Sequence, residues 1–161
     1  MAAKTGTYTL IASNTLGSSS SSLTFSSIPG TYTDLVIVFS GTSTALAGIN
    51  IQFNGDTGTN YSRTVLDGNG SAASSSRETS QVASTLGLSS TTQSDTIFHI
   101  FDYANTTTYK TVLSRANVSA SLVRAAAGLW RSTAAVTSIT LSYPTFNTGS
   151  TFKLYGIEAA K

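Results

Sequence analysis

The fold class is decided by the stretch Thr137-Ser138-Ile139-Thr140-Leu141-Ser142-Tyr143, in which apolar and hydroxyl side chains alternate from Ser138 onward. Because successive side chains of a β-strand point to opposite faces, Ile139, Leu141 and Tyr143 share one face and the hydroxyls share the other. A strand of this pattern is buried on one side and solvated on the other, as in an antiparallel sheet that packs on a second sheet. The stretch therefore predicts a β-sandwich.

The composition of the whole chain agrees with this prediction. About a third of the 161 residues are Ser or Thr, and only 10% are Asp, Glu, Lys or Arg, against about 25% in an ordinary soluble domain. Hydrophobic residues make up 40%, which is more than a disordered polar segment contains. Since β-branched Thr suits a half-exposed strand, the hydroxyls indicate the neutral polar skin of a sheet protein.

Short strand-like runs recur along the chain, separated by Gly, Asn, Ser and Pro, whereas good helix formers are scarce. The main ambiguity is the stretch 120–130, because its alanines tolerate a helix while Gly128 and the flanking hydroxyl residues favour a strand. The serine-rich stretches 17–22 and 71–76 are predicted to be exposed, mobile loops. Strands are predicted at 7–12, 21–28, 34–40, 49–53, 62–66, 81–83, 96–103, 110–117, 122–131, 137–143 and 151–158.

About ten short strands without an internal repeat or a linker predict one all-β domain covering residues 1–161. The expected architecture is an antiparallel β-sandwich, jelly-roll-like, with residues 1–10 as a candidate N-terminal arm. A chain of this length buries about 70% of its unfolded surface on folding, so it needs no disulfide or metal to be stable.

Two predicted strands break the alternating pattern. Every side chain from 35 to 39 is apolar, and the run 97–101 is apolar on both faces except at His99. A strand in a two-layer sandwich has only one inner face, so the second face needs a cover from a loop, from the N-terminal arm or from a neighbouring subunit. The candidate interface residues on these strands are Leu35, Ile37, Phe39, Phe98 and Ile100.

Trp130 and Arg131 are the best further interface candidates, because Trp and Arg are enriched among residues that dominate binding energy. The seven tyrosines offer a second use of aromatic side chains, as a platform on which sugar rings stack. The alternative for Tyr143 and Phe146 is that they close the core.

The sequence contains no recognisable catalytic motif. Its one histidine, His99, lies between Phe98 and Ile100. Serine is so frequent that pairing His99 with an Asp and a Ser carries no information, and no Gly-x-Ser-x-Gly elbow accompanies it. We therefore expect His99 to lie on a strand without a catalytic role.

Paired carboxylates and metal ligands are equally indistinct. A glycosidase would have to bring Glu78 or Glu158 next to an Asp in space, because no two acids share a short motif. Asn54, Asp56 and Asn60 offer oxygens in a Gly-rich loop, but their spacing lacks the bidentate Glu of an EF-hand and suits a capped hairpin turn better. We expect no enzymatic activity, no cofactor and no metal.

The charge pattern argues against a nucleic-acid or membrane partner. The net charge of +2 comes from nine cations that are spread singly along the chain, whereas nucleic-acid binding needs a concentrated cationic surface. The longest apolar runs are far too short to span a bilayer. The N-terminus lacks the apolar core of a signal peptide, so synthesis in a cytoplasm is expected.

Three segments of the chain resemble a set of small virion proteins of tailed bacteriophages, common in phages of cyanobacteria. They are 28–37 (IPGTYTDLVI), 53–62 (FNGDTGTNYS) and 149–157 (GSTFKLYGI). The run Asp102-Tyr103-Ala104-Asn105, the run Tyr109-Lys110-Thr111 and Trp130 fit the same pattern in the same order. These motifs are turn and strand signatures rather than catalytic ones.

The resemblance implies a β-sandwich structural protein of the particle, and such proteins are usually trimers. The expected role is a capsid decoration (cement) protein on the virion surface that clamps neighbouring subunits of the major capsid protein. The absence of a long shaft favours this role over a fibre. The alternative is a tail or fibre module that recognises a glycan of the host surface, and a glycosidase is a distant third.

Overall fold

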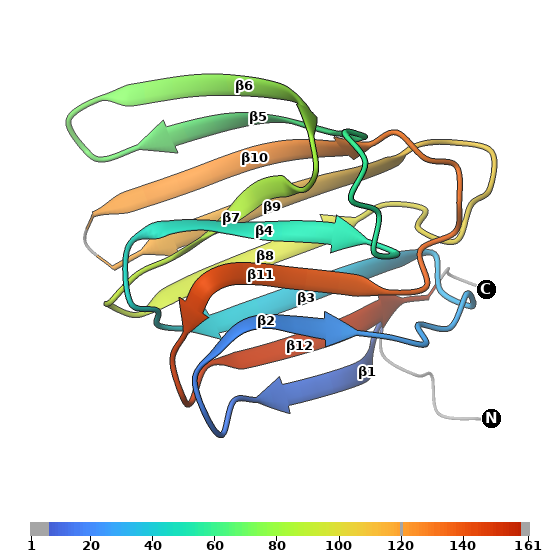
Figure 1. The fold of residues 1–161 in the computed structure, drawn as a ribbon, viewed down its shortest axis with the longest axis horizontal. Helices are drawn as coiled ribbons and strands as arrows, with labels where there is room; N and C mark the ends of the chain where they lie inside the picture. Colours follow the sequence, from blue (N-terminus) through green and yellow to red (C-terminus); the bar gives the residue numbers. More distant parts are fainter. Residues whose placement is uncertain (1–6, 120, 159–161) are drawn as a thin grey trace.

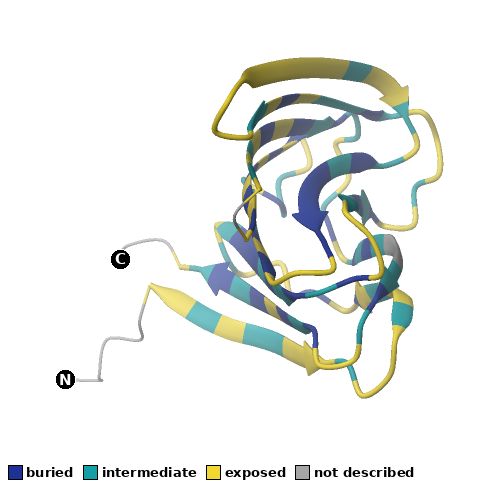
Figure 2. Ribbon diagram, turned by 90° about the vertical axis from the view of Figure 1, so that its left-hand side faces the viewer, coloured by how far each residue is buried: buried dark blue, intermediate teal, exposed yellow. Residues whose placement is uncertain are grey.

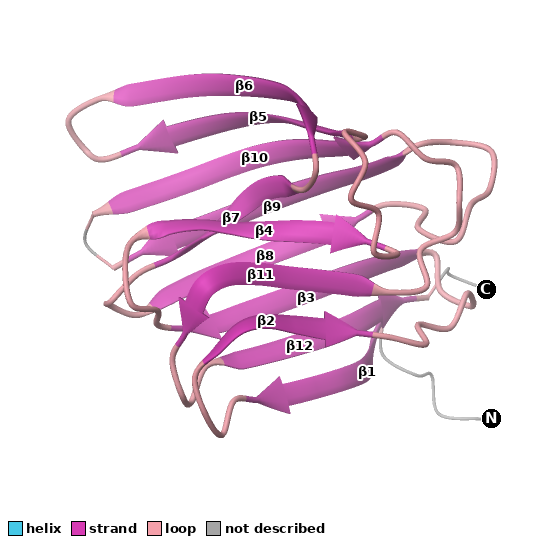
Figure 3. Cartoon of the chain, in the orientation of Figure 1, coloured by secondary structure: helices cyan, strands magenta, loops and turns pink. Residues whose placement is uncertain are grey.

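The computed structural model describes residues 7–119 and 121–158, and they form an antiparallel β-sandwich of twelve strands without a helix (Figure 1; Figure 3). The larger sheet has eight strands in the order β1-β12-β3-β8-β9-β10-β5-β6. Its strands are β1 (Tyr8–Thr15), β12 (Thr151–Ile157), β3 (Asp34–Gly41), β8 (Ser94–Ile100), β9 (Lys110–Val118), β10 (Leu122–Trp130), β5 (Tyr61–Gly68) and β6 (Ala73–Gln81). The smaller sheet contains β2 (Ser20–Phe25), β11 (Ile139–Phe146), β4 (Ala47–Phe53) and β7 (Ser84–Ser89), in that order.

The chain passes repeatedly between the two sheets. The first four strands alternate between the larger and the smaller sheet, and β11 returns to the smaller sheet before β12 ends in the larger one. Every strand pair is antiparallel, and β1 pairs with β12, so the two ends of the described chain lie side by side in the sheet. This crossing pattern is the jelly-roll-like sandwich expected from the sequence.

The core lies between the sheets, where the alternation of the sequence has its effect. Ile139 and Leu141 of β11 are fully buried and face β3 and its neighbours, while Ser142 stays partly exposed. Buried and exposed positions alternate along most strands of both sheets (Figure 2). The side chain of Tyr143 lies outside the described residues, whereas Phe146 closes the core as expected.

Two local expectations need correction, one ambiguity is resolved, and one expectation lies partly outside the described residues. Residues 73–81 form β6 rather than a loop, so most of the predicted serine loop at 71–76 is strand. Of the predicted strand at 81–83, Gln81 ends β6 and residues 82–83 connect it to β7, which was missed. The ambiguous stretch 120–130 is strand β10 from Leu122 onward. The candidate N-terminal arm falls partly on residues 1–6, which lie outside the described residues, and residues 8–10 belong to β1.

The smaller sheet covers only part of the larger one, and two ion pairs lie on the inner face near β7. Arg63 pairs with Glu78 at 2.7 Å, and Arg124 pairs with Asp67 at 2.8 Å. Arg63 Nη1 also donates to the carbonyl of Thr85 on β7 at 2.6 Å. These arginines therefore connect the end of the larger sheet to the edge of the smaller one through polar contacts.

Burial of Tyr61 predicts a loss of stability at high pH. Its hydroxyl exchanges hydrogen bonds with the backbone of Phe53, and burial raises the pKa of Tyr61 from 10.0 to about 12. Because the folded chain holds this proton more tightly than the unfolded chain, the contribution is complete below pH 10 and disappears as the pH rises toward 12. We expect the raised pKa of Tyr61 to contribute about 2–3 kcal/mol to the free energy of unfolding below pH 10.

Urea unfolding measured in steps from about pH 9 to pH 12 tests this expectation. The variant Tyr61→Phe should lose less stability over that range than the parent protein does. Tyr109→Phe is the matched control, because Tyr109 is exposed and its substitution should leave the pH dependence unchanged. Equal alkaline losses in the parent protein and in Tyr61→Phe would contradict the assignment.

Candidate interaction surface

The five strand residues proposed as interface candidates all lie inside the sandwich. Leu35, Ile37 and Phe39 of β3 and Phe98 and Ile100 of β8 have no exposed surface. They belong to the main core cluster, so no partner reaches them in the folded chain. The two strands are apolar on both faces, as predicted. The residues chosen as interface candidates, however, lie on the inner face. The outer face, which a partner could contact, carries the residues between them in the sequence.

The outer face of these strands is apolar and partly open. Val36 is 7% exposed, whereas Val38, Ile97 and His99 are half-buried. Val36 and Val38 of β3 stand opposite His99 and Ile97 of β8 in the strand register. The described part of the N-terminal segment extends the sheet as β1 instead of folding over this face (Figure 1). Among residues 7–119 and 121–158, the N-terminal segment therefore does not provide the second cover expected from the sequence.

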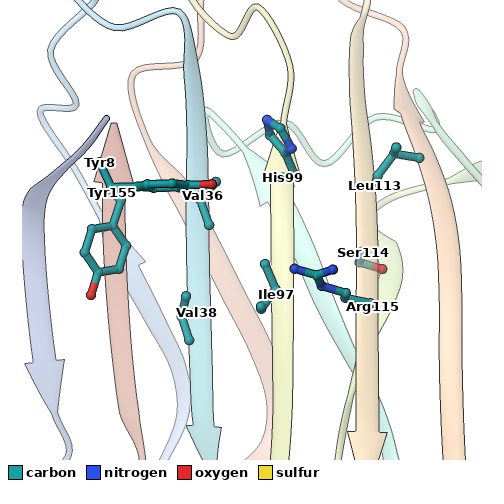
Figure 4. A pocket seen from close by; sticks show the side chains of 9 residues that line it. All are labelled: Tyr8, Val36, Val38, Ile97, His99, Leu113, Ser114, Arg115 and Tyr155. Atoms are coloured by element: carbon teal, nitrogen blue, oxygen red, sulfur yellow. The ribbon is translucent and has the colours of Figure 1, made fainter. Parts of the chain in front are cut away.

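A shallow groove of about 570 Å³ runs across this outer face (Figure 4). Five adjacent strands contribute to it, from β1 at one end to β9 at the other. Its lining contains Tyr8, Val36, Val38, Ile97, His99, Leu113, Ser114, Arg115 and Tyr155. Ser114 contributes least, since it is buried and its hydroxyl donates to the carbonyl of Leu86 on the inner side.

Four side chains give the groove its polar features. His99 Nε2 lies 3.0 Å from Asp34 Oδ2, and the His99 ring stacks on Phe101 with centroids 4.1 Å apart. Arg115 reaches from β9 toward β8 across the groove (Figure 4). Tyr8 and Tyr155 meet edge to face at the other end, with centroids 6.4 Å apart. The arrangement is an apolar floor with aromatic and cationic walls.

A second apolar area on the same face extends beyond the groove, and we call it the β5–β10 patch. It consists of Leu66, Val123, Ala125 and Ala127. Leu66 is 58% exposed and Val123 is 60% exposed. Because Ala125 pairs directly with Leu66, the four side chains form one continuous surface. Contiguous exposed apolar side chains of this kind often mark a contact site.

Trp130 is a core residue rather than an exposed anchor, which corrects the sequence-based expectation. It is 2% exposed, and its ring stacks on Tyr61 at 6.3 Å between centroids. Its Nε1 donates to Asp56 Oδ2 at 2.7 Å. Arg131, next in the chain, is partly exposed and donates to the carbonyl of Thr59 at 2.9 Å. Both residues therefore fix the loop that precedes β5.

The Gly-rich loop at 54–60 uses its oxygens as hydrogen-bond acceptors. Asp56 accepts from Trp130, from Asn60 Nδ2 at 2.9 Å and from the Gly58 amide at 2.8 Å. The hydrogen bond from Trp130, followed by that from Asn60, lowers the pKa of Asp56 below 3.8. Asn54 Oδ1 accepts from the Thr137 amide at 2.8 Å. The loop is thus a capped turn that holds the Trp130 indole.

The described part of the chain brings together no set of side chains with an evident chemical function. His99 contacts Asp34, a partner that sequence reasoning did not consider, rather than a serine. Among residues 7–119 and 121–158, no three His, Asp or Glu side chains gather as metal ligands would. The same residues contain no helical segment of the length and apolarity that a membrane crossing needs.

Comparison with known proteins adds no assignment. No protein-family model matches the sequence, and no curated protein is significantly similar to it.

Proposed function

We propose that this chain is a non-enzymatic structural protein of a phage virion, and that it decorates the assembled capsid as a cement protein. The observation that carries the proposal is the open apolar outer face of a single, charge-poor sandwich domain. The resemblance of 28–37, 53–62 and 149–157 to small phage virion proteins supports it. Decoration works by adhesion, since a protein that binds the assembled shell preferentially stabilises that state by mass action.

The surface chemistry supports adhesion through apolar contacts rather than through ion pairs. Of the eight large hydrophobic residues exposed in the described chain, Tyr8, Leu10, Leu66, Leu113 and Val123 lie on the outer face of the larger sheet. Charged residues make up only 10% of the sequence. The partner is the major capsid protein, and the site of action is the capsid surface.

Sedimentation with phage capsids that lack decoration protein (decoration-free heads) tests the proposal. We expect the purified protein to pellet with heads in about 1 M NaCl, because salt at that concentration screens surface ion pairs but not apolar burial. The variant Ile97→Asp should bind at least about tenfold more weakly, since it places a charge on the apolar floor.

Val82→Asp is the matched control, because Val82 is an exposed apolar residue away from this face. It should pellet as the parent protein does. If the parent protein stays in the supernatant at every salt concentration, the cement role is refuted.

A tail or fibre module that binds a host glycan is the second candidate function. The two tyrosines of the groove, Tyr8 and Tyr155, favour it, because sugar rings stack on exposed aromatic side chains. This function predicts binding of the isolated protein to host cells and no retention on heads. The sedimentation experiment, repeated with host cell walls, separates the two functions.

A further inference from the structure

The groove combines an apolar floor with a single cation that has no acidic partner. Arg115 is exposed and lies opposite Ile97 of β8 in the strand register. No carboxylate of the described residues lies within ion-pair distance of it, whereas Arg63 and Arg124 on the inner face each have one. None of the residues that line the groove is acidic, and the nearest acid on this face, Asp95, lines the adjoining hollow without pairing with Arg115. The groove therefore complements a negative charge.

His99, the other polar residue of the groove, is already engaged. Its Nε2 contacts Asp34, and Asp34 Oδ1 in turn accepts from the Asp102 amide at 2.8 Å. Stacking on Phe101 holds the ring against one end of the groove. Arg115 is thus the charged donor that remains open to an incoming group.

The floor selects the kind of molecule that carries this charge. Val36, Val38, Ile97 and Leu113 are aliphatic and offer no hydrogen-bonding group. Sugar hydroxyls that lay on these four side chains would lose their water without gaining partners, which is unfavourable. Aliphatic side chains on an extended segment gain from the same floor, because burial of apolar surface stabilises the bound state.

We propose that the groove binds an extended protein segment in which a carboxylate lies between two aliphatic side chains, with Arg115 as the contact of the carboxylate. An extended segment directs alternate side chains to one face, so the recognised pattern is aliphatic-x-acid-x-aliphatic. Only the assignment of this segment to the major capsid protein rests on the proposed function. Binding of such a segment to the groove can be tested without capsids.

The probe is the acetylated, amidated pentapeptide Leu-Ser-Glu-Ser-Leu, compared with its Gln analogue. Binding is followed by NMR of methyl groups. Addition of the peptide should shift the methyl resonances of Val36, Val38, Ile97 and Leu113. We expect the Glu peptide to bind about three- to fivefold more tightly than the Gln peptide, as a partly exposed charge contact provides.

The variant Arg115→Gln should fold normally, because its side chain is exposed, and should bind both peptides equally. Arg77→Gln on β6 is the matched control, since it removes an exposed cation of the same sheet away from the groove. It should keep the preference for the Glu peptide.

Several results would overturn the inference. These are the absence of saturable shifts at millimolar peptide, equal binding of the two peptides by the parent protein, or a preference that persists in Arg115→Gln. Binding of polygalacturonate in place of the peptides, with loss in Arg115→Gln, would assign the groove to an acidic glycan instead. Failure of the protein to pellet with heads, while the peptide preference holds, refutes the cement role alone.

Discussion

Replacement of Trp130 by Ala should destabilise the fold by about 3–5 kcal/mol, as large-to-small changes of buried aromatic residues do. The indole is 2% exposed, packs on Phe53 at 5.4 Å between centroids and donates a hydrogen bond to Asp56. The substitution removes the packing and takes one donor from the Asp56 carboxylate. Because the free energy of unfolding of a domain is about 5–15 kcal/mol, this loss is a large fraction of it.

Guanidinium unfolding followed by far-UV circular dichroism measures the loss without relying on the deleted fluorophore. Tyr109→Ala is the control, because it removes an exposed aromatic residue and should cost less than about 0.5 kcal/mol. The stability loss of Trp130→Phe should lie between those of Trp130→Ala and Tyr109→Ala, because Phe keeps a ring but loses the donor to Asp56. A loss below about 1 kcal/mol for Trp130→Ala would show that the indole is not part of the core.

The second large effect that we expect is on assembly. The resemblance to phage virion proteins implies a trimer, and we expect copies of the chain to meet at the apolar β5–β10 patch. Sedimentation at micromolar concentration should report about three times 16.6 kDa. The double variant Leu66→Lys with Val123→Lys should sediment as a monomer, because it places two charges at exposed positions of that patch.

Leu46→Lys with Val82→Lys provides the matched control. Both residues are 53% exposed and lie in connections between strands, so the double variant adds the same charge without touching the patch. It should remain a trimer. A monomer for the parent protein would contradict the assembly prediction and would leave the cement role to be tested by the heads alone.

The sequence predicted the fold class well because the alternation of apolar and hydroxyl residues is a local signal. It failed at β6, where nine residues without a single large apolar side chain form an edge strand, since backbone pairing with β5 rather than burial creates that strand. The serine content of 71–76 was correctly recognised as exposed, but exposure does not distinguish a loop from an edge strand.

The candidate surface was located on the correct strands and assigned to the wrong side of them. In a run such as 35–39 both faces are apolar, so the sequence contains no signal for which face turns inward. Pairing with neighbouring strands decides it, and pairing is a non-local property. Trp130 was misassigned for a related reason, because its partner Asp56 is distant in sequence and only the fold brings the two together.

The unequal size of the two sheets also has a consequence for motion. Strands β5 and β6 form a hairpin at the end of the larger sheet, and β6 has a neighbour on one side only (Figure 1). Its link to β7 depends on the Arg63 contacts with Glu78 and with Thr85, which are polar and compete with water. Local opening should therefore begin at β6, and its amide protons should exchange with solvent well before those of β3 and β8. We therefore expect the sandwich to open first at the β5–β6 end of the larger sheet, while the strands covered by the smaller sheet stay paired.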